Sequence, residues 1–235
     1  IFARGTEEKP LKILIFRNRN DAYLHIATIS CNGSAFDQVE YVQMDNNSGY
    51  ELVVGRLLDA QVLGNVSVYN FVNKEAQVLL SASYSKFLTV DLDSDGLTEL
   101  FVLRPGQTET DRGIAEMYGV EQGVMERSNE VNMSEPVSQL KRVIVGKLHG
   151  DQTAVYTASA VGDAALITDV YTMADGLLKN VSISNESGTS MQTMRNYYVY
   201  ADDIDNDGDW GYEAIVMNNS SDIMPSCLPS NIKYS

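Results

Sequence analysis

The sequence predicts an all-β protein built from a repeated unit, and three observations lead to this expectation. Helical periodicity is almost absent, whereas short runs of Val, Ile, Leu and Tyr with two-residue alternation recur between turn residues. An aromatic-rich strand followed by a short turn returns several times along the chain. The 235 residues are enough to bury one sizeable core or to form a repeat array.

Apolar alternation and flanking turn residues place the individual strands. We expect strands at 11–17, 22–30, 38–44, 50–58, 65–72, 76–85, 86–92, 98–104, 113–120, 124–131, 139–148, 153–161, 164–173, 176–183, 196–204 and 212–217. The stretches 105–112 and 184–195 are rich in Gly, Thr, Ser and Asn, so we expect surface loops there.

The repeated strand carries Leu14, Tyr69, Tyr118 and Tyr171 at matching positions, which lie 55, 49 and 53 residues apart. A period of about 50 residues with four strands per unit is typical of β-propeller blades, each of which buries its faces against its neighbours. We therefore expect a β-propeller of four-stranded antiparallel blades in a single domain over 1–235. The expected units are a partial blade at 1–37, blades at 38–85, 86–137 and 138–192, and a partial blade at 193–235.

The ends of the chain favour a fragment of a complete ring. The sequence starts without Met, and Ile1-Phe2-Ala3 has the pattern of the end of a strand. We expect the missing blades, and any export signal, to lie outside this sequence.

Net charge excludes one class of partner. Seventeen basic and 32 acidic residues give a formal net charge of −15, which would repel a nucleic-acid backbone, so we expect no nucleic-acid binding. No apolar run approaches the roughly 20 residues that a membrane helix needs.

An acidic turn between two apolar runs is the most specific motif in the chain. Several carboxylates on alternate residues of a tight loop would repel one another unless a hard cation lay among them, so we interpret the turn as a calcium loop. We expect carboxylate oxygens from Asp91, Asp93, Asp95 and Glu99, the carbonyl of Leu97, and a positive φ at Gly96.

The turn allows two other interpretations. An EF-hand needs flanking helices and a Glu at position twelve, but that position is Val102 and the flanks are predicted strands. A solvated acidic β-turn without metal is the simpler alternative. Three alternate Asp residues that occur twice at matching places in a repeat favour the metal.

The acidic loop recurs with decreasing fidelity between the first and second strands of other units. A second calcium loop is expected to use Asp203, Asp205, Asp207, the carbonyl of Asp209, and Glu213. The stretch 43–51 keeps an Asp, an Asn and the Glu, and 146–152 has lost nearly every acid, so calcium binding is in doubt at both.

The two intact loops resemble the FG-GAP/VCBS repeats of calcium-binding β-propellers. The matching residues are 90–102 and 203–208. The whole chain is similar to VCBS-repeat lipoproteins of gut Clostridia, which carry an export signal and a lipid-anchored Cys upstream of the propeller. The resemblance implies calcium as cofactor and an extracytoplasmic location, either secreted or lipid-anchored at the cell surface.

Other reactive side chains suggest no catalytic constellation. His25 is expected to be an ordinary strand residue and His149 a surface loop residue, while Cys31 and Cys227 could pair or both be free. Sequence motifs of nucleophile elbows, zinc sites and phosphate-binding loops are absent. Aromatic residues that could bind a sugar or peptide, or simply pack a blade, are Tyr197, Tyr198, Tyr200, Trp210 and Tyr212.

These observations favour a non-catalytic recognition module whose ligand is a protein or a glycan. One alternative is a carbohydrate-active lyase or hydrolase that uses carboxylates and tyrosines of a central channel. The other is a structural spacer within a surface protein. Membrane contact is expected only through the possible upstream lipid anchor.

Overall fold

The computed structural model describes residues 2–3, 11–47, 49–58, 63–72, 75–149, 152–162, 165–182, 200–201 and 214–215. Within these residues the chain folds almost entirely into antiparallel β-strands, as the alternating apolar pattern predicts. No helix in this part of the chain is long and apolar enough to cross a lipid bilayer.

The strands form successive antiparallel sheets in which chain neighbours pair. The first sheet holds β1 (Phe2–Ala3), β2 (Leu11–Arg19) and β3 (Ala22–Cys31). The second holds β4 (Ala35–Val42), β5 (Glu51–Leu57), β6 (Gly64–Val72) and β7 (Glu75–Tyr84). The third holds β8 (Lys86–Val90), β9 (Glu99–Arg104), β10 (Ile114–Glu121) and β11 (Val124–Asn132).

A short 3-10 helix, η1 (Val137–Gln139), leads into the fourth sheet. This sheet holds β12 (Leu140–His149), β13 (Gln152–Val161), β14 (Ala165–Ala174) and β15 (Leu177–Asn180). A separate pair joins β16 (Tyr200–Ala201) and β17 (Ala214–Ile215). The three four-stranded sheets cover nearly the same stretches as the predicted units 38–85, 86–137 and 138–192.

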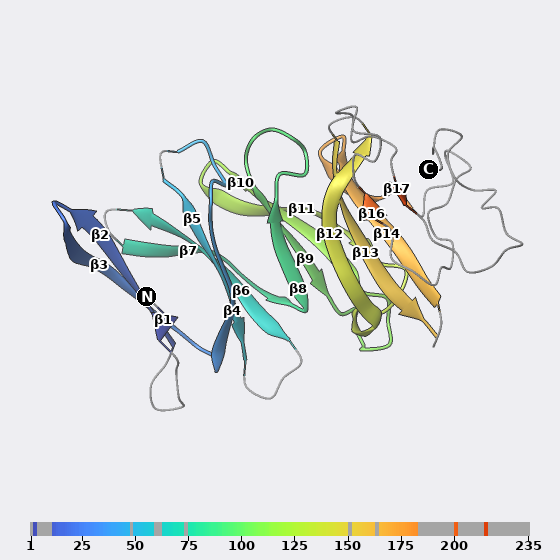
Figure 1. Cartoon of the computed structure of the whole chain (residues 1–235), viewed down its shortest axis with the longest axis horizontal. Coiled ribbons are helices and arrows are strands. Elements are labelled where there is room, and N and C mark those ends of the chain that lie inside the picture. Colours follow the sequence, from blue (N-terminus) through green and yellow to red (C-terminus); the bar gives the residue numbers. More distant parts are fainter. Residues whose placement is uncertain are drawn as a thin grey trace, which may run out of the picture.

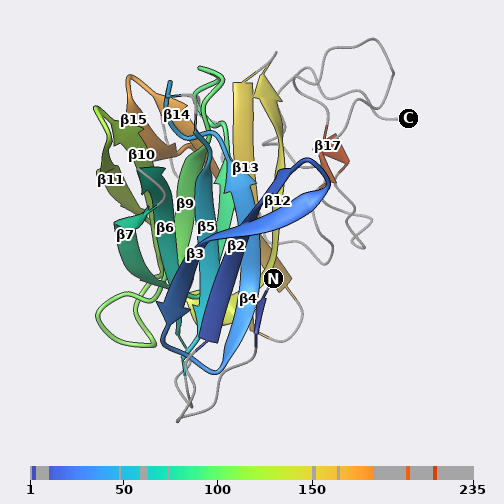
Figure 2. The same ribbon diagram turned by 90° about the vertical axis from the view of Figure 1, so that its left-hand side faces the viewer.

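The four large sheets follow one another along the long axis of the molecule, from blue β2–β3 to orange β14–β15 (Figure 1). Viewed from the N-terminal end, they lie one behind another with their faces adjacent (Figure 2). Three buried apolar clusters agree with this arrangement, because each of them combines side chains of two consecutive sheets. Each inner sheet therefore buries both of its faces.

The second strand of each four-stranded sheet is the most deeply buried. Five consecutive residues of β9, from Glu99 to Leu103, and six of β5, from Glu51 to Arg56, are buried. A strand covered on both faces needs continuous rather than alternating apolar residues, and Val53-Val54 and Leu100-Phe101-Val102-Leu103 supply them. Gly55 lets the next sheet approach, because a Cβ there would lie 2.5 Å from the Phe87 ring.

Tight turns join the last two strands in three of the described sheets. Both residues of the turns Asn20-Asp21, Gln122-Gly123 and Asp175-Gly176 have positive φ. Two-residue turns of this kind match the right-handed twist of a hairpin. The aromatic repeat lies in the strand that precedes the last strand of each four-stranded sheet, with Tyr69 in β6, Tyr118 in β10 and Tyr171 in β14.

Candidate functional site

The predicted acidic loop connects β8 to β9 and folds around its own carboxylates. Asp93 Oδ1 accepts a hydrogen bond from the Asp95 backbone N–H at 3.1 Å, and Asp95 Oδ1 accepts one from Leu97 N–H at 2.7 Å. Asp91 Oδ2 reaches across the loop to accept one from Gly96 N–H at 3.1 Å. Asp side chains favour such local bonds, which explains why this sequence turns here.

Backbone geometry at the tip of the loop agrees with the prediction for Gly96, whose φ is +88°. Ser94 also adopts the left-handed region, with φ +64°. Two left-handed residues within three positions curl the chain tightly enough to aim several carboxylates inward.

Three carboxylates converge at the base of the loop. One oxygen each of Asp91, Asp93 and Glu99 lie within 4.8 Å of one another. Glu99 is 9% exposed, and its Oε2 accepts a hydrogen bond from Leu92 N–H at 2.9 Å. Asp91 Oδ1, unlike the Oδ2 that accepts from Gly96 N–H, is buried and has no hydrogen-bond partner among the described residues. A buried oxygen without a donor, among further carboxylates, suits a cation that prefers oxygen ligands.

The electrostatics of this cluster disfavour three negative charges without a counterion. Burial above all, and with it the nearby carboxylates of Asp93, Asp95 and Asp91, raises the pKa of Glu99 from its ordinary 4.5 to about 8. Burial likewise raises the pKa of Asp93, with Asp95 and Asp91 adding to the effect. A divalent cation would reverse this balance, because it favours the charged form of each carboxylate.

Asp95 and Leu97 lie beside these three carboxylates. Together with Asp93 and Glu99 they line a cavity of about 410 Å³ that also borders Gly176. The Asp95 carboxylate is not among the three that converge. The second predicted loop, with Asp203, Asp205, Asp207, Asp209 and Glu213, lies outside the described residues.

The stretch 43–51 repeats the frame of the acidic loop with one informative change. Glu51 Oε2 accepts a hydrogen bond from Met44 N–H at 2.9 Å, as Glu99 does from Leu92. Gln43 stands where the intact loop has Asp91, and its amide nitrogen donates to the backbone carbonyls of Asp45 and Asn47, at 2.7 Å for Asn47. An amide donor thus occupies the position from which Asp91 would reach a cation.

The two loops are also joined to each other. Thr98 N–H donates to the Gln43 carbonyl at 2.8 Å, which connects the β8–β9 loop to the preceding sheet. An ion held by the intact loop would therefore stiffen a contact between sheets as well as the first hairpin of its own sheet.

The described residues of the stretch 146–152 belong to strands, with 146–149 in β12 and Gln152 in β13. Strands β12 and β13 extend as one hairpin until His149 pairs with Gln152. Only residues 150 and 151 separate the strands, so there is no room for a carboxylate-bearing loop.

The remaining predicted candidates occupy ordinary positions. His25 is exposed on β3, packs edge-to-face on Phe16 with ring centroids 5.4 Å apart, and pairs with Thr28 Oγ1 at 2.8 Å. Cys31 is buried with its sulfur 3.8 Å from the Tyr69 hydroxyl. Cys227 and the side chains of Tyr197, Tyr198, Tyr200, Trp210 and Tyr212 lie outside the described part of the structure.

A carboxylate cluster that the sequence did not predict lies on β9, β10 and β11. Glu116 is 3% exposed and pairs with Arg104 at 2.9 Å and Arg127 at 2.7 Å, while the Tyr118 hydroxyl donates to it at 2.9 Å. Burial raises the pKa of Glu116, but the hydrogen bonds from Arg104, Arg127 and Tyr118 outweigh it and lower the pKa overall. Glu116 is thus an ionised carboxylate with both oxygens occupied, which suits a structural role better than proton transfer.

The described molecule is therefore an all-β protein of consecutive antiparallel sheets with a candidate cation loop at one sheet corner. No protein-family model matches the chain, and no curated protein sequence matches it. Solved structures with some similarity include a rhamnogalacturonan lyase PL11 of Bacillus licheniformis, at 11% identity and a TM-score of 0.47, covering 88% of this chain and 49% of that one.

Two further rhamnogalacturonan lyase structures show comparable similarity. The exotype enzyme YesX matches at 15% identity and a TM-score of 0.46, covering 90% of this chain and 41% of that one. YesW matches at 13% identity and a TM-score of 0.44, covering 90% and 42%. The chain spans less than half the length of each of the three structures, and at these scores the similarity assigns it no activity.

Proposed function

We propose that this chain is a non-catalytic, calcium-stabilised recognition module displayed outside the cell. The observation that carries the proposal is the convergence of Asp91, Asp93 and Glu99, together with the buried Asp91 Oδ1, which has no hydrogen-bond donor among the described residues. Calcium suits this flexible, carboxylate-rich loop better than magnesium, which demands near-ideal octahedral geometry. Weak calcium sites fill where calcium is millimolar, which favours a secreted or lipid-anchored protein.

We further propose that the successive sheets are blades of one β-propeller domain of the FG-GAP/VCBS type. Support comes from the order of the strands, which pair in sequence within each sheet, and from the apolar clusters between consecutive sheets. The position of the acidic loop, between the first and second strands of a sheet, is the same at 43–51 and 91–99. Calcium would act as a structural ligand of the 91–99 loop. Through the hydrogen bond from Thr98 N–H to the Gln43 carbonyl, it would also stabilise the contact with the 43–51 loop.

Recognition of a ligand is favoured over catalysis by the state of the described carboxylates. Glu116 is the buried acid that has a Tyr and Arg residues beside it, yet its oxygens are occupied and its pKa is lowered. The raised pKa of Glu99 belongs to the candidate calcium loop. A glycan or a protein is therefore the proposed partner.

Thermal unfolding in calcium and in chelator tests the proposal. A ligand at 100 times its dissociation constant adds about 2.7 kcal/mol to the free energy of unfolding. For a chain of this size we expect the melting temperature to rise by about 5 to 10 °C in calcium. Magnesium at the same concentration is the control and should give a much smaller rise; identical curves in calcium and chelator would refute the calcium-stabilised module.

Calcium affinity should depend on pH through Glu99. Its raised pKa of about 8 means that a proton competes with calcium for the site below that pH. The ionised fraction falls about 50-fold between pH 8 and pH 6, so the dissociation constant should rise by a similar factor. Without calcium, the folded protein holds a proton that the unfolded chain has lost between pH 4.5 and 8, so the free energy of unfolding should decrease as the pH rises through this window.

Calorimetric titration of calcium at several pH values, together with denaturant unfolding in chelator, measures both effects. A pH-independent calcium affinity between pH 6 and 8 would show that Glu99 is ionised before calcium arrives or does not bind it.

A further inference from the structure

A second concave region lies away from the acidic loop, between the β1–β3 and β4–β7 sheets. It has a volume of about 910 Å³, within the range of pockets that bind small molecules. Strand β2 contributes one wall, and β6 with the 45–52 stretch contributes the other. The candidate calcium ligands of the β8–β9 loop do not line it.

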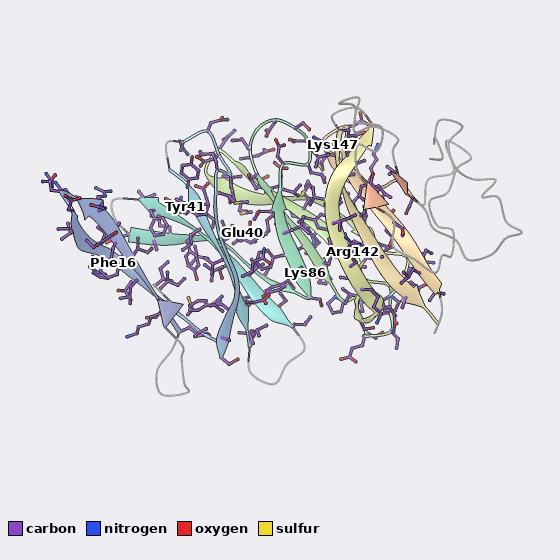
Figure 3. The ribbon with its side chains drawn as sticks, viewed as in Figure 1. Phe16, Glu40, Tyr41, Lys86, Arg142 and Lys147 are labelled. Carbon is purple, nitrogen blue, oxygen red and sulfur yellow. The ribbon has the colours of Figure 1, made fainter. Side chains whose placement is uncertain are left out.

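Aromatic rings with exposed faces are grouped at this cleft. Tyr41 and Tyr50 stack with centroids 5.2 Å apart and an interplanar angle of 23°, although they are 64% and 49% exposed. Phe16, on the opposite sheet, also borders the cleft; Figure 3 labels Phe16 on the blue β1–β3 sheet and Tyr41 near the neighbouring sheet. Two tyrosines already stacked on each other form a rigid platform that loses little side-chain entropy when a ligand covers it.

The polar groups of the cleft are suited to hydroxyl donors. Asn70 Oδ1, on β6, is buried and has no hydrogen-bond partner among the described residues. Leaving such an acceptor unpaired is costly, and a ligand hydroxyl that reached it would remove that cost. Asp45 and Glu51 also line the cleft and add negative charge to it.

Charge decides between classes of polar ligand. The cleft contains two carboxylates, at Asp45 and Glu51, against the single cation of Arg17, and the whole chain carries −15. An acidic polysaccharide would be repelled, whereas a neutral saccharide offers apolar ring faces for tyrosines and hydroxyl donors for acceptors.

We propose that the cleft between β2 and β6, with Tyr41, Tyr50 and Asn70, is the binding site for a neutral oligosaccharide. This inference rests on the proposed recognition function and names its ligand class and place. The apolar face of a sugar ring covers Tyr41 or Tyr50, and one of its hydroxyl groups donates to Asn70 Oδ1.

Calorimetric titration of the full chain in calcium tests the site. The probes are neutral tetrasaccharides of glucose, galactose, mannose and xylose, with tetragalacturonate as the acidic comparison. At least one neutral probe should bind, and Tyr41→Ala should weaken it by about tenfold or more. Tyr23→Ala is the matched control, because Tyr23 is 75% exposed on β3 and does not line the cleft.

A second variant separates binding from folding. Asn70→Leu removes the unpaired acceptor, so it should weaken saccharide binding while leaving the melting temperature unchanged or higher. A variant that failed to fold would lose both saccharide binding and the melting temperature of the wild-type chain. Binding of tetragalacturonate alone, binding of no neutral probe, or equal effects of Tyr41→Ala and Tyr23→Ala would overturn the proposal.

The same samples distinguish this failure from failure of the proposed function. A calcium-dependent melting temperature without saccharide binding refutes the cleft alone. Saccharide binding without a calcium-dependent melting temperature supports the proposed saccharide site and refutes the calcium-stabilised module.

Discussion

Asp91→Gln is expected to abolish the calcium-dependent rise in melting temperature without lowering the melting temperature measured in chelator. The variant introduces the residue found at the equivalent position of the neighbouring loop, where the Gln43 amide donates to the carbonyls of Asp45 and Asn47. At position 91 the same amide can reach the corresponding carbonyls, so the loop stays closed. The exchange removes one negative charge and the unpaired Oδ1, on which cation binding depends.

Asp45→Asn is the matched control for this exchange, because Asp45 occupies in its loop the place that Asp93 has in the intact one. Its carboxylate is already bound, accepting from the backbone N–H of Asn47 at 2.8 Å and from the side-chain amide of the same residue at 2.6 Å. We expect the control to keep the full calcium response in scanning calorimetry. An undiminished response in Asp91→Gln, or its loss in Asp45→Asn, would move the calcium site elsewhere.

Phe101→Ala should lower the free energy of unfolding by about 3 to 5 kcal/mol, the usual cost of deleting a buried aromatic ring. Phe101 on β9 is 0% exposed, and its ring lies 5.3 Å from that of Tyr171 on β14, in the next sheet. Both rings belong to the apolar cluster between the two sheets. Truncation therefore leaves a cavity where one sheet packs on another.

Denaturant unfolding measures this loss, with Val78→Ala as the control. Val78 on β7 is 59% exposed, so its truncation should change the free energy of unfolding by no more than about 0.5 kcal/mol. A cost below about 1 kcal/mol for Phe101→Ala would contradict the described packing of the third sheet on the fourth.

Local patterns in the sequence were sufficient to predict the strands and the acidic loop. Alternating or continuous apolar runs set the strands, as in the buried residues 100–103 of β9. The positive φ of Gly96 follows from the Asp-Gly pair at the loop tip, and it is confirmed. The pairing of consecutive strands into four-stranded antiparallel sheets is also confirmed. These features depend on residues close together in sequence.

Features that depend on distant residues could not be predicted. Glu116 meets Arg104 and Arg127 only because three strands pair in one register, and no local motif indicates that meeting. The stacking of Tyr41 on Tyr50 similarly depends on how β4 and β5 pair across the intervening loop.

The degenerate loops illustrate a different limit. Loss of an acid at Gln43 indicates weaker metal binding, but the donation of its amide to two backbone carbonyls is a matter of geometry. At 146–152 the missing acids look the same in the sequence, although there the strands extend until His149 pairs with Gln152. The loss of acidic residues from one copy of a repeat can thus reflect an exchange within a loop that is kept, or strands that extend where the loop would be.

The most direct test of the central claim is a crystal structure of the chain grown in calcium, with the ion located by its anomalous scattering. Our account predicts one calcium ion in the β8–β9 loop, 2.3 to 2.6 Å from carboxylate oxygens of Asp91, Asp93 and Glu99. Asp91 Oδ1, the buried oxygen without a donor, should be among its ligands. Ordered water alone between these carboxylates, or calcium bound only at another loop, would contradict it.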